Sequence, residues 1–454
     1  MRPTLFADSG RRALAALTLA GLVVAAAPAA AQGRVALTVE AAVTRAVEHA
    51  PRLAEARARE AAARSTYESK RATALPTGSV STALSRNNHV DEVLIGLPTG
   101  GTRVLFPDIP DNYRVRGELL VPVYAFGRVG ATLAAARSDI DAATADLRAT
   151  EAEVRLDAAR VYWTMVTARE TVRLLEQSLA RTDAFVADVK ARVDAGVLPP
   201  NDVLSAQAQR ARHAVRLIQA RNDQALLELE LGRLIGERAG VAIDATSAVD
   251  RAGAATGDLV AATAEDLIAR AVGARAERES LSARSASLRS SAMAALANVR
   301  PYLTGLAAVE PARPNMRFVP PIDAWRTSWS LGVNMTWPLW DSGRSRAESA
   351  ALTSQAAAVD ARRTEFDDLV AIEVRQRLLD LDAGRAALAA SREAVLAATE
   401  ARRVVEERFR AGVATNTDVL DAQVALLEAE VEQTRLHATQ RITEARLVRA
   451  VGSR

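Results

Sequence analysis

The sequence repeats itself at a fixed interval of 216 positions. Gly127-Arg128 recurs as Gly343-Arg344, and Pro122 recurs as Pro338. The same interval joins Ala195-Gly196-Val197 to Ala411-Gly412-Val413, Asp202-Val203-Leu204 to Asp418-Val419-Leu420, Ala206-Gln207 to Ala422-Gln423, and Gly236 to Gly452. Because short words that match by chance do not hold one interval over such a distance, the chain contains a duplication. Both halves must therefore adopt the same arrangement of elements.

Each repeat contains a very long helical stretch. From Gly127 to Ala195 there is no proline and only Gly130 inside, so about 65 residues can be continuously helical, roughly 100 Å in length. Apolar positions along it alternate in steps of four and three: Val154, Ala158, Val161, Met165, Ala168, Val172, Leu175 and Leu179. This spacing is typical of a coiled-coil seam, and an aromatic content of only 4% favours close helix packing through small side chains.

A glycine turn follows each long helix, and after it comes a second helical stretch with its own apolar seam. Each repeat is therefore predicted to form an antiparallel helical hairpin. Shorter helical stretches, about 39–74 and 264–298, open the two repeats. The expected domains are a signal peptide over 1–31, a first repeat over 32–236, a linker over 237–263 and a second repeat over 264–454.

Two strand-like segments lie between the helices of each repeat. They cover about 77–86 and 113–124 in the first repeat, and about 301–309 and 327–340 in the second. The last is the clearest, because apolar residues share one face, namely Trp329, Leu331, Val333, Met335, Trp337 and Leu339, while Ser328, Ser330, Gly332, Asn334 and Thr336 share the other. An apolar face opposite a polar face over about ten residues is typical of a transmembrane β-strand.

Aromatic residues gather at these segments, as expected of side chains at a membrane interface. They are Trp325, Trp329, Trp337 and Trp340 in the second repeat, with Tyr113 and Tyr124 at the matching place in the first. A soluble sheet packed on helices is the alternative, and the polar second face combined with export favours the membrane. Four strands leave unpaired edges in lipid, so closure must come from further copies, two giving 8 strands and three giving 12.

The first residues predict export. Arg11 and Arg12 precede an apolar run over 13–27, then Pro28 and three alanines, which is the pattern of a secretory signal peptide cleaved after Ala31. An N-terminal membrane anchor is the alternative reading. The chain has no cysteine, which excludes disulfides and anchoring through an acylated N-terminal cysteine.

No motif in the sequence indicates a catalytic, cofactor or metal site. The four histidines are scattered, no phosphate loop or nucleophile motif occurs, and the net charge of +3 is spread along the chain. We therefore expect no enzyme activity, no cofactor, no metal site and no nucleic-acid partner.

These features together resemble the TolC family of outer-membrane efflux and secretion channels. The resemblance rests on the duplicated order of helix, strand pair, long helix and return helix, with Ala-Gly-Val-x-x-x-x-Asp-Val-Leu at both turns. It implies an α+β membrane protein in the outer membrane, a homotrimer whose helical hairpins form an α-barrel reaching into the periplasm and whose strands share a 12-stranded β-barrel among outer-membrane lipids. It further implies a passive export duct that engages a periplasmic adaptor (membrane fusion) protein and an inner-membrane pump, in tripartite efflux or type I secretion.

The resemblance also assigns residues. Gly196 and Gly412 fall at the periplasmic tip, and Asp418 and Asp421 match carboxylates that ring the pore entrance, so three copies would supply six. Asp418 has a local alternative in capping its helix. The counterpart of Asp421 is Ser205, so the turn itself does not require that second carboxylate.

In the family, a tyrosine and an arginine of the second hairpin tie the closed tip to an aspartate of the first. Asp202 is present here, but the tyrosine position is Phe409 and the arginine position is Ala414. We therefore do not expect closure by that latch, although Arg408 or Arg410 could substitute.

Two other classes share some of these features. A periplasmic coiled-coil scaffold or adaptor would have the hairpins but no membrane strands. A surface adhesin-like trimer would place its helices outside the cell.

Overall fold

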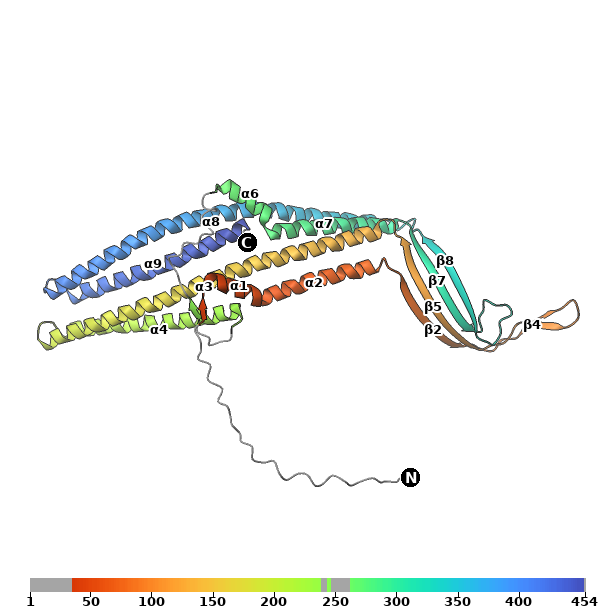
Figure 1. Ribbon diagram of the computed structural model, residues 1–454, viewed down its shortest axis with the longest axis horizontal. Helices are drawn as coiled ribbons and strands as arrows, with labels where there is room; N and C mark the ends of the chain where they lie inside the picture. The colour runs from red at the N-terminus through yellow and green to blue at the C-terminus, as the bar shows by residue number, and fades with distance from the viewer. Residues whose placement is uncertain (1–34, 238–242, 246–261, 453–454) are drawn as a thin grey trace, which may run out of the picture.

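The computed structural model describes residues 35–237, 243–245 and 262–452, so the expected signal peptide and most of the expected linker lie outside the described residues. Helices form one end of an elongated molecule and a curved sheet forms the other (Figure 1). The helices are α1 (Val39–His49), α2 (Pro51–Ala72), α3 (Arg128–Asp194), α4 (Asn201–Ile235), α6 (Ala264–Ala274), α7 (Ala276–Leu296), the short 3₁₀ turn η2 (Ala297–Val299), α8 (Arg344–Arg410) and α9 (Asn416–Val451). The strands are β1 (Val35–Leu37), β2 (Thr77–Arg86), β3 (Val93–Gly96), β4 (Thr102–Phe106), β5 (Asp111–Tyr124), β6 (Ile243–Ala245), β7 (Tyr302–Arg313) and β8 (Arg326–Thr336).

The two long helices, α3 and α8, are each 67 residues long and continuous, as the absence of proline predicts. Each begins after a glycine in the left-handed conformation, Gly127 at φ 91° and Gly343 at φ 82°. The chain then turns back, α4 packing along α3 and α9 along α8. Each repeat therefore contains an antiparallel helical hairpin, and the two hairpins lie side by side in Figure 1.

The duplication extends into the core. Met165 and Leu231 lie in one buried cluster of α1, α3 and α4, and their counterparts Leu381 and Leu447 lie in the equivalent cluster of α6, α8 and α9. All four side chains are almost fully buried. The same seam positions therefore stabilise both hairpins by removing apolar surface from water.

The expected stretch over 39–74 is two helices, because the chain leaves the helical conformation at Ala50, at φ −64° and ψ 119°. Pro51 explains this break, since the proline ring clashes with a helical conformation of the preceding residue.

The expected stretch over 264–298 is also two helices, with the break at Arg275 and no proline beside it. The Arg275 guanidinium is buried, and its Nη1 donates to the carbonyl oxygen of Ala450 at 3.3 Å and to Glu373 Oε2 at 3.1 Å. No signal in the neighbouring sequence predicts this break. It coincides with contacts that Arg275 makes to residues far away in the sequence.

Four strands form one antiparallel sheet in the order β2-β5-β7-β8. Strand β2 pairs with β5, and β7 with β8, as hairpins within each repeat, while β5 pairs with β7 across the repeats. Strand β8 ends at Thr336 and does not reach the expected residue 340. Pro338 explains the earlier end, because proline has no amide hydrogen to donate to a neighbouring strand. Strand β7 runs on to Arg313, four residues past the expected end.

A further hairpin, β3–β4, which the strand-like patterning did not predict, lies within the segment between β2 and β5. It extends beyond the sheet at the far end of the molecule from the helices (Figure 1). Among the described residues, none of the helices is both long and apolar enough to cross a membrane.

Candidate functional site

The tips of the two hairpins turn in the same way. Gly196 and Gly412 have φ of +75° and +80°, a conformation that glycine adopts at least cost. The next amide reaches back across each turn, Val197 N to Arg192 O at 2.8 Å and Val413 N to Arg408 O at 2.9 Å. These bonds satisfy carbonyl groups left free at the helix ends, so both tips are ordered turns.

Asp418 lies in the first turn of α9, where it forms a capping box with Thr415. Its Oδ2 accepts from Thr415 N and from Thr415 Oγ1, both at 2.8 Å, and its own amide donates to Thr415 Oγ1 at 3.2 Å. These bonds lower the pKa of the exposed Asp418 carboxyl below its usual value, so the group is ionised at neutral pH. The capping role expected as the local alternative is therefore present, and it leaves the charge exposed.

Asp421 follows one turn later on α9, and positions three apart share a helix face. Its side chain is exposed, and within the described residues it makes no hydrogen bond or ion pair. Each chain therefore presents two neighbouring carboxylates beside the second tip.

Phe409 joins the two hairpins by apolar packing. It is only 4% exposed, and its ring lies 5.5 Å from that of Phe185 on α3. Val189 and Val419 are buried in the same cluster, and the Arg192 guanidinium covers the ring at 5.0 Å. We call these residues, Phe185, Val189, Phe409 and Val419, the tip cluster.

Asp202 contributes to the contact between the tips through its main chain. Asn416 Nδ2 donates to Asp202 O at 3.0 Å, and Asn416 is itself buried. Sequence reasoning missed Asn416, Phe185 and Val189, because the pairing of the two hairpins is a long-range contact. Arg408 and Arg410 are both exposed at the end of α8.

The two faces of the sheet differ as their alternation predicts. On one face the side chains of β8 are apolar and strongly exposed, with Trp329 at 72%, Leu331 at 77% and Val333 at 69%. Val80 and Leu84 of β2 continue this apolar face. The opposite face carries Arg116, Glu118 and Glu310 beside serines, a charged group that the sequence patterning did not single out.

The aromatic residues lie at two levels of the sheet. Trp325, Trp329 and Tyr113 lie toward the β3–β4 end, and the Tyr113 and Trp325 rings are 6.3 Å apart. Trp337, Trp340 and Tyr124 lie toward the helices, where Trp337 Nε1 donates to Val299 O at 3.2 Å. Trp329 and Trp337 are eight residues apart, about 26 Å along a strand. A strand tilted by about 35–45° rises about 20 Å over that length, which fits within the apolar band of about 25 Å in outer-membrane barrels.

Residues 42–237 and 274–453 match the family described as outer membrane efflux protein. Together these two segments cover most of both repeats and omit the stretch between them. The chain is also 27% identical over 331 residues to the outer membrane efflux protein BepC of Brucella suis biovar 1 (strain 1330), covering 69% of each protein.

Solved channel structures share the fold. The outer-membrane channel OprN superposes with a TM-score of 0.75 at 19% identity, covering 92% of this chain and 90% of that one. The outer membrane protein VceC of Vibrio cholerae superposes with a TM-score of 0.74 at 18% identity, covering 91% of this chain and 96% of that one. At these identities the likeness establishes the arrangement of helices and strands.

Proposed function

The chain belongs to the outer membrane efflux protein family, and on that premise we propose that it is one subunit of a trimeric, passive export duct gated at its helical tips. It lies in the outer membrane, with its helical part extending into the periplasm. The observation that carries the proposal is the sheet, which exposes an apolar face and whose two edge strands, β2 and β8, have no further partner among the described residues.

The strand directions support closure by further copies. Neighbouring strands alternate in direction from β2 to β8, so β8 of one copy and β2 of the next can pair antiparallel. A ring of three such sheets is a 12-stranded barrel without edges, and in lipid only a barrel without edges satisfies every backbone group of a sheet. Its outer face would contact outer-membrane lipid, with the two aromatic levels at the membrane interfaces.

The carboxylates beside the second tip support a cation-selective entrance. Three copies of Asp418 and Asp421 would place six negative charges around the axis, which favours cations and repels anions. Because the capping box uses Asp418 locally, the unpaired Asp421 is the residue we expect to contribute more to selectivity.

The tip cluster supports a closed state held by apolar contact. Separating the hairpins of one chain would expose Phe409 and Phe185 to water and break the bond from Asn416 to Asp202 O. Gating at Gly196 and Gly412 would then be a movement of whole hairpins. A periplasmic adaptor protein and an inner-membrane pump would supply the energy for it, in tripartite efflux or type I secretion.

The proposed function is tested by single-channel recording of the purified protein in planar bilayers. Wild-type protein is expected to give small, cation-selective openings that enlarge and lose selectivity in the double variant Asp418→Ala, Asp421→Ala. The control is Asp91→Ala with Glu92→Ala, which removes the same charge at the opposite end of the molecule and is expected to leave selectivity unchanged.

Failure of every protein to insert would contradict the channel and favour a periplasmic scaffold. Equal currents in the wild type and in the tip variant would support the proposed channel but contradict the proposed role of the carboxylates at its entrance.

A further inference from the structure

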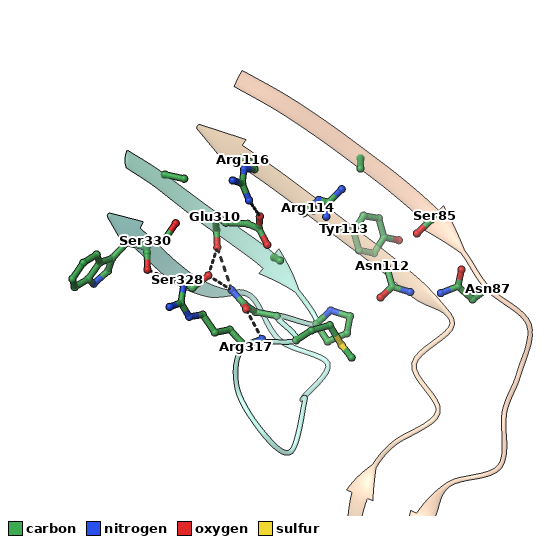
Figure 2. A pocket seen from close by; sticks show the side chains of 17 residues that line it. Ser85, Asn87, Asn112, Tyr113, Arg114, Arg116, Glu310, Arg317, Ser328 and Ser330 are labelled. Atoms are coloured by element: carbon green, nitrogen blue, oxygen red, sulfur yellow. Dashed lines mark hydrogen bonds and ion pairs between the residues drawn. The ribbon is translucent and has the colours of Figure 1, made fainter. Parts of the chain in front are cut away.

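An open cavity of about 380 Å³ lies on the polar face of the sheet, near its β3–β4 end. Strands β2, β5, β7 and β8 form its floor, and the segment after β7, from Pro314 to Arg317, forms a wall (Figure 2). Asn315 fixes that wall, because its Nδ2 donates to Glu310 O at 3.1 Å, to Arg326 O at 3.0 Å and to Ser328 Oγ at 3.2 Å. The cavity is therefore built from one chain.

Three arginines, Arg114, Arg116 and Arg317, and a single carboxylate, Glu310, line this cavity. Arg116 is paired with two carboxylates, since its Nε donates to Glu118 Oε2 at 2.8 Å and its Nη1 to Glu310 Oε2 at 3.2 Å, so these three groups together carry one net negative charge. The two remaining guanidinium groups, those of Arg114 and Arg317, outweigh this negative charge, so the site as a whole is positive.

Arg114 is exposed and has no ion pair or hydrogen-bond partner within the described part of the chain. Arg317 donates through Nη1 to the carbonyl oxygen of Trp329 at 3.0 Å, and in that region it has no carboxylate partner. A guanidinium that lacks a carboxylate retains donors arranged to grip the two oxygens of an oxyanion.

Neutral groups surround these cations. Ser85, Asn87 and Ser330 line the cavity with hydroxyl and amide groups that make no side-chain hydrogen bond within the described residues. The volume lies at the lower end of the range of small-molecule sites, about 300 to 1,000 Å³. It suits a small organic molecule better than a lone inorganic ion.

We propose that this cavity binds small organic oxyanions, carried as carboxylate or phosphate groups, through Arg114 and Arg317. The proposal rests on the proposed channel, because it places the site in the wide part of the duct, beyond the tip carboxylates. The duct then has charges of opposite sign at its two ends. An anion in the barrel would pause at Arg114, where the six carboxylates cannot repel it.

Citrate is the probe for this site, and the readout is block of single-channel current by citrate added to either side of the bilayer. Wild-type current is expected to fall saturably, at lower citrate concentration from the barrel side than from the tip side. Arg114→Gln is expected to raise the half-blocking concentration about tenfold, the size of one charge-assisted contact. Arg103→Gln, the same change on the β3–β4 hairpin outside the cavity, is expected to have no effect.

A variant that binds citrate more tightly distinguishes an anion site from a purely structural role of these charged residues. Glu310→Gln removes one of the two negative charges beside Arg116 and is expected to lower the half-blocking concentration. No block of wild-type current, or equal shifts in Arg114→Gln and Arg103→Gln, would overturn the site while leaving the channel intact.

If no channel forms, isothermal titration of citrate into the detergent-solubilised full chain decides the matter separately. A dissociation constant for citrate that rises about tenfold in Arg114→Gln supports the cavity, and absence of heat with wild type overturns it.

Discussion

A buried histidine in the first hairpin shows how burial lowers the pKa of a side chain. His213 of α4 is fully buried between the helices of the first hairpin. Its Nδ1 lies 3.1 Å from Thr182 Oγ1, and its Nε2 lies 2.9 Å from Gln209 Nε2. Burial, followed by repulsion from Arg216 and Arg181, lowers the pKa of the imidazole below its usual value. Both arginines face carboxylates of α9, Glu428 and Glu430.

This lowered pKa predicts a stability that falls in acid. Below pH 6.5 the unfolded chain binds a proton at His213 that the folded chain resists. Stability from this group is therefore complete above pH 6.5 and is lost as pH falls toward the lower, folded pKa. His213→Gln should show a smaller drop in melting temperature between pH 7.5 and pH 5.5 than wild type, measured by circular dichroism. His49→Gln, a change at an exposed histidine, should keep the wild-type drop, and equal drops in all three proteins would contradict the prediction.

At the scale of elements, the two hairpins depend on glycine only where the backbone requires it. Gly412 needs its positive φ to turn from α8 to α9, whereas Gly130 lies inside α3 with helical geometry and open space around it. The same substitution should therefore have opposite effects at the two positions.

Gly412→Ala is expected to destabilise the protein by about 1 kcal/mol, the cost of a side chain in the left-handed region. Gly130→Ala is expected to stabilise it by about 0.5 to 1 kcal/mol, through a less flexible unfolded chain and better helix propensity. Denaturant unfolding of both variants measures the difference. Shifts of the same sign would contradict the assignment of the turn.

Local signals predicted some elements and missed others. The absence of proline predicted the continuous helices, and Pro51 carried a readable signal for the break between α1 and α2. Gly100-Gly101 between two short apolar runs could have predicted the β3–β4 hairpin. The break at Arg275 and the packing of Phe409 on Phe185 were not readable, because contacts far apart in the sequence determine them.

The candidate sites likewise contain residues that the sequence predicts and residues that it does not. The turn glycines and Asp418 were readable because the duplication and the helix start fix their positions. The cavity at Arg114 combines four strands with the segment after β7, and strand alternation alone gives no sign of that folded-back wall.

At the scale of the whole molecule, we expect further copies of the chain to cover the two edges of the sheet. Its apolar face is exposed, and strands β2 and β8 end the ladder on either side. The helices also expose large apolar side chains, among them Leu204 and Ile218 of α4 and Leu379 and Leu396 of α8. We therefore expect assembly to bury helical surface as well as the edges of the sheet.

The most direct test is disulfide trapping between β2 of one copy and β8 of the next, in a chain that has no natural cysteine. Ser81→Cys is combined in turn with Ser328→Cys, Ser330→Cys or Asn334→Cys, because a disulfide forms only when the two Cα atoms lie within about 7 Å. For at least one pair in outer membranes, oxidation should give a ladder of linked chains that ends at three, while each single-cysteine variant stays monomeric. A ladder that ends at another number, or no linkage with any pair, would contradict a barrel shared among three chains.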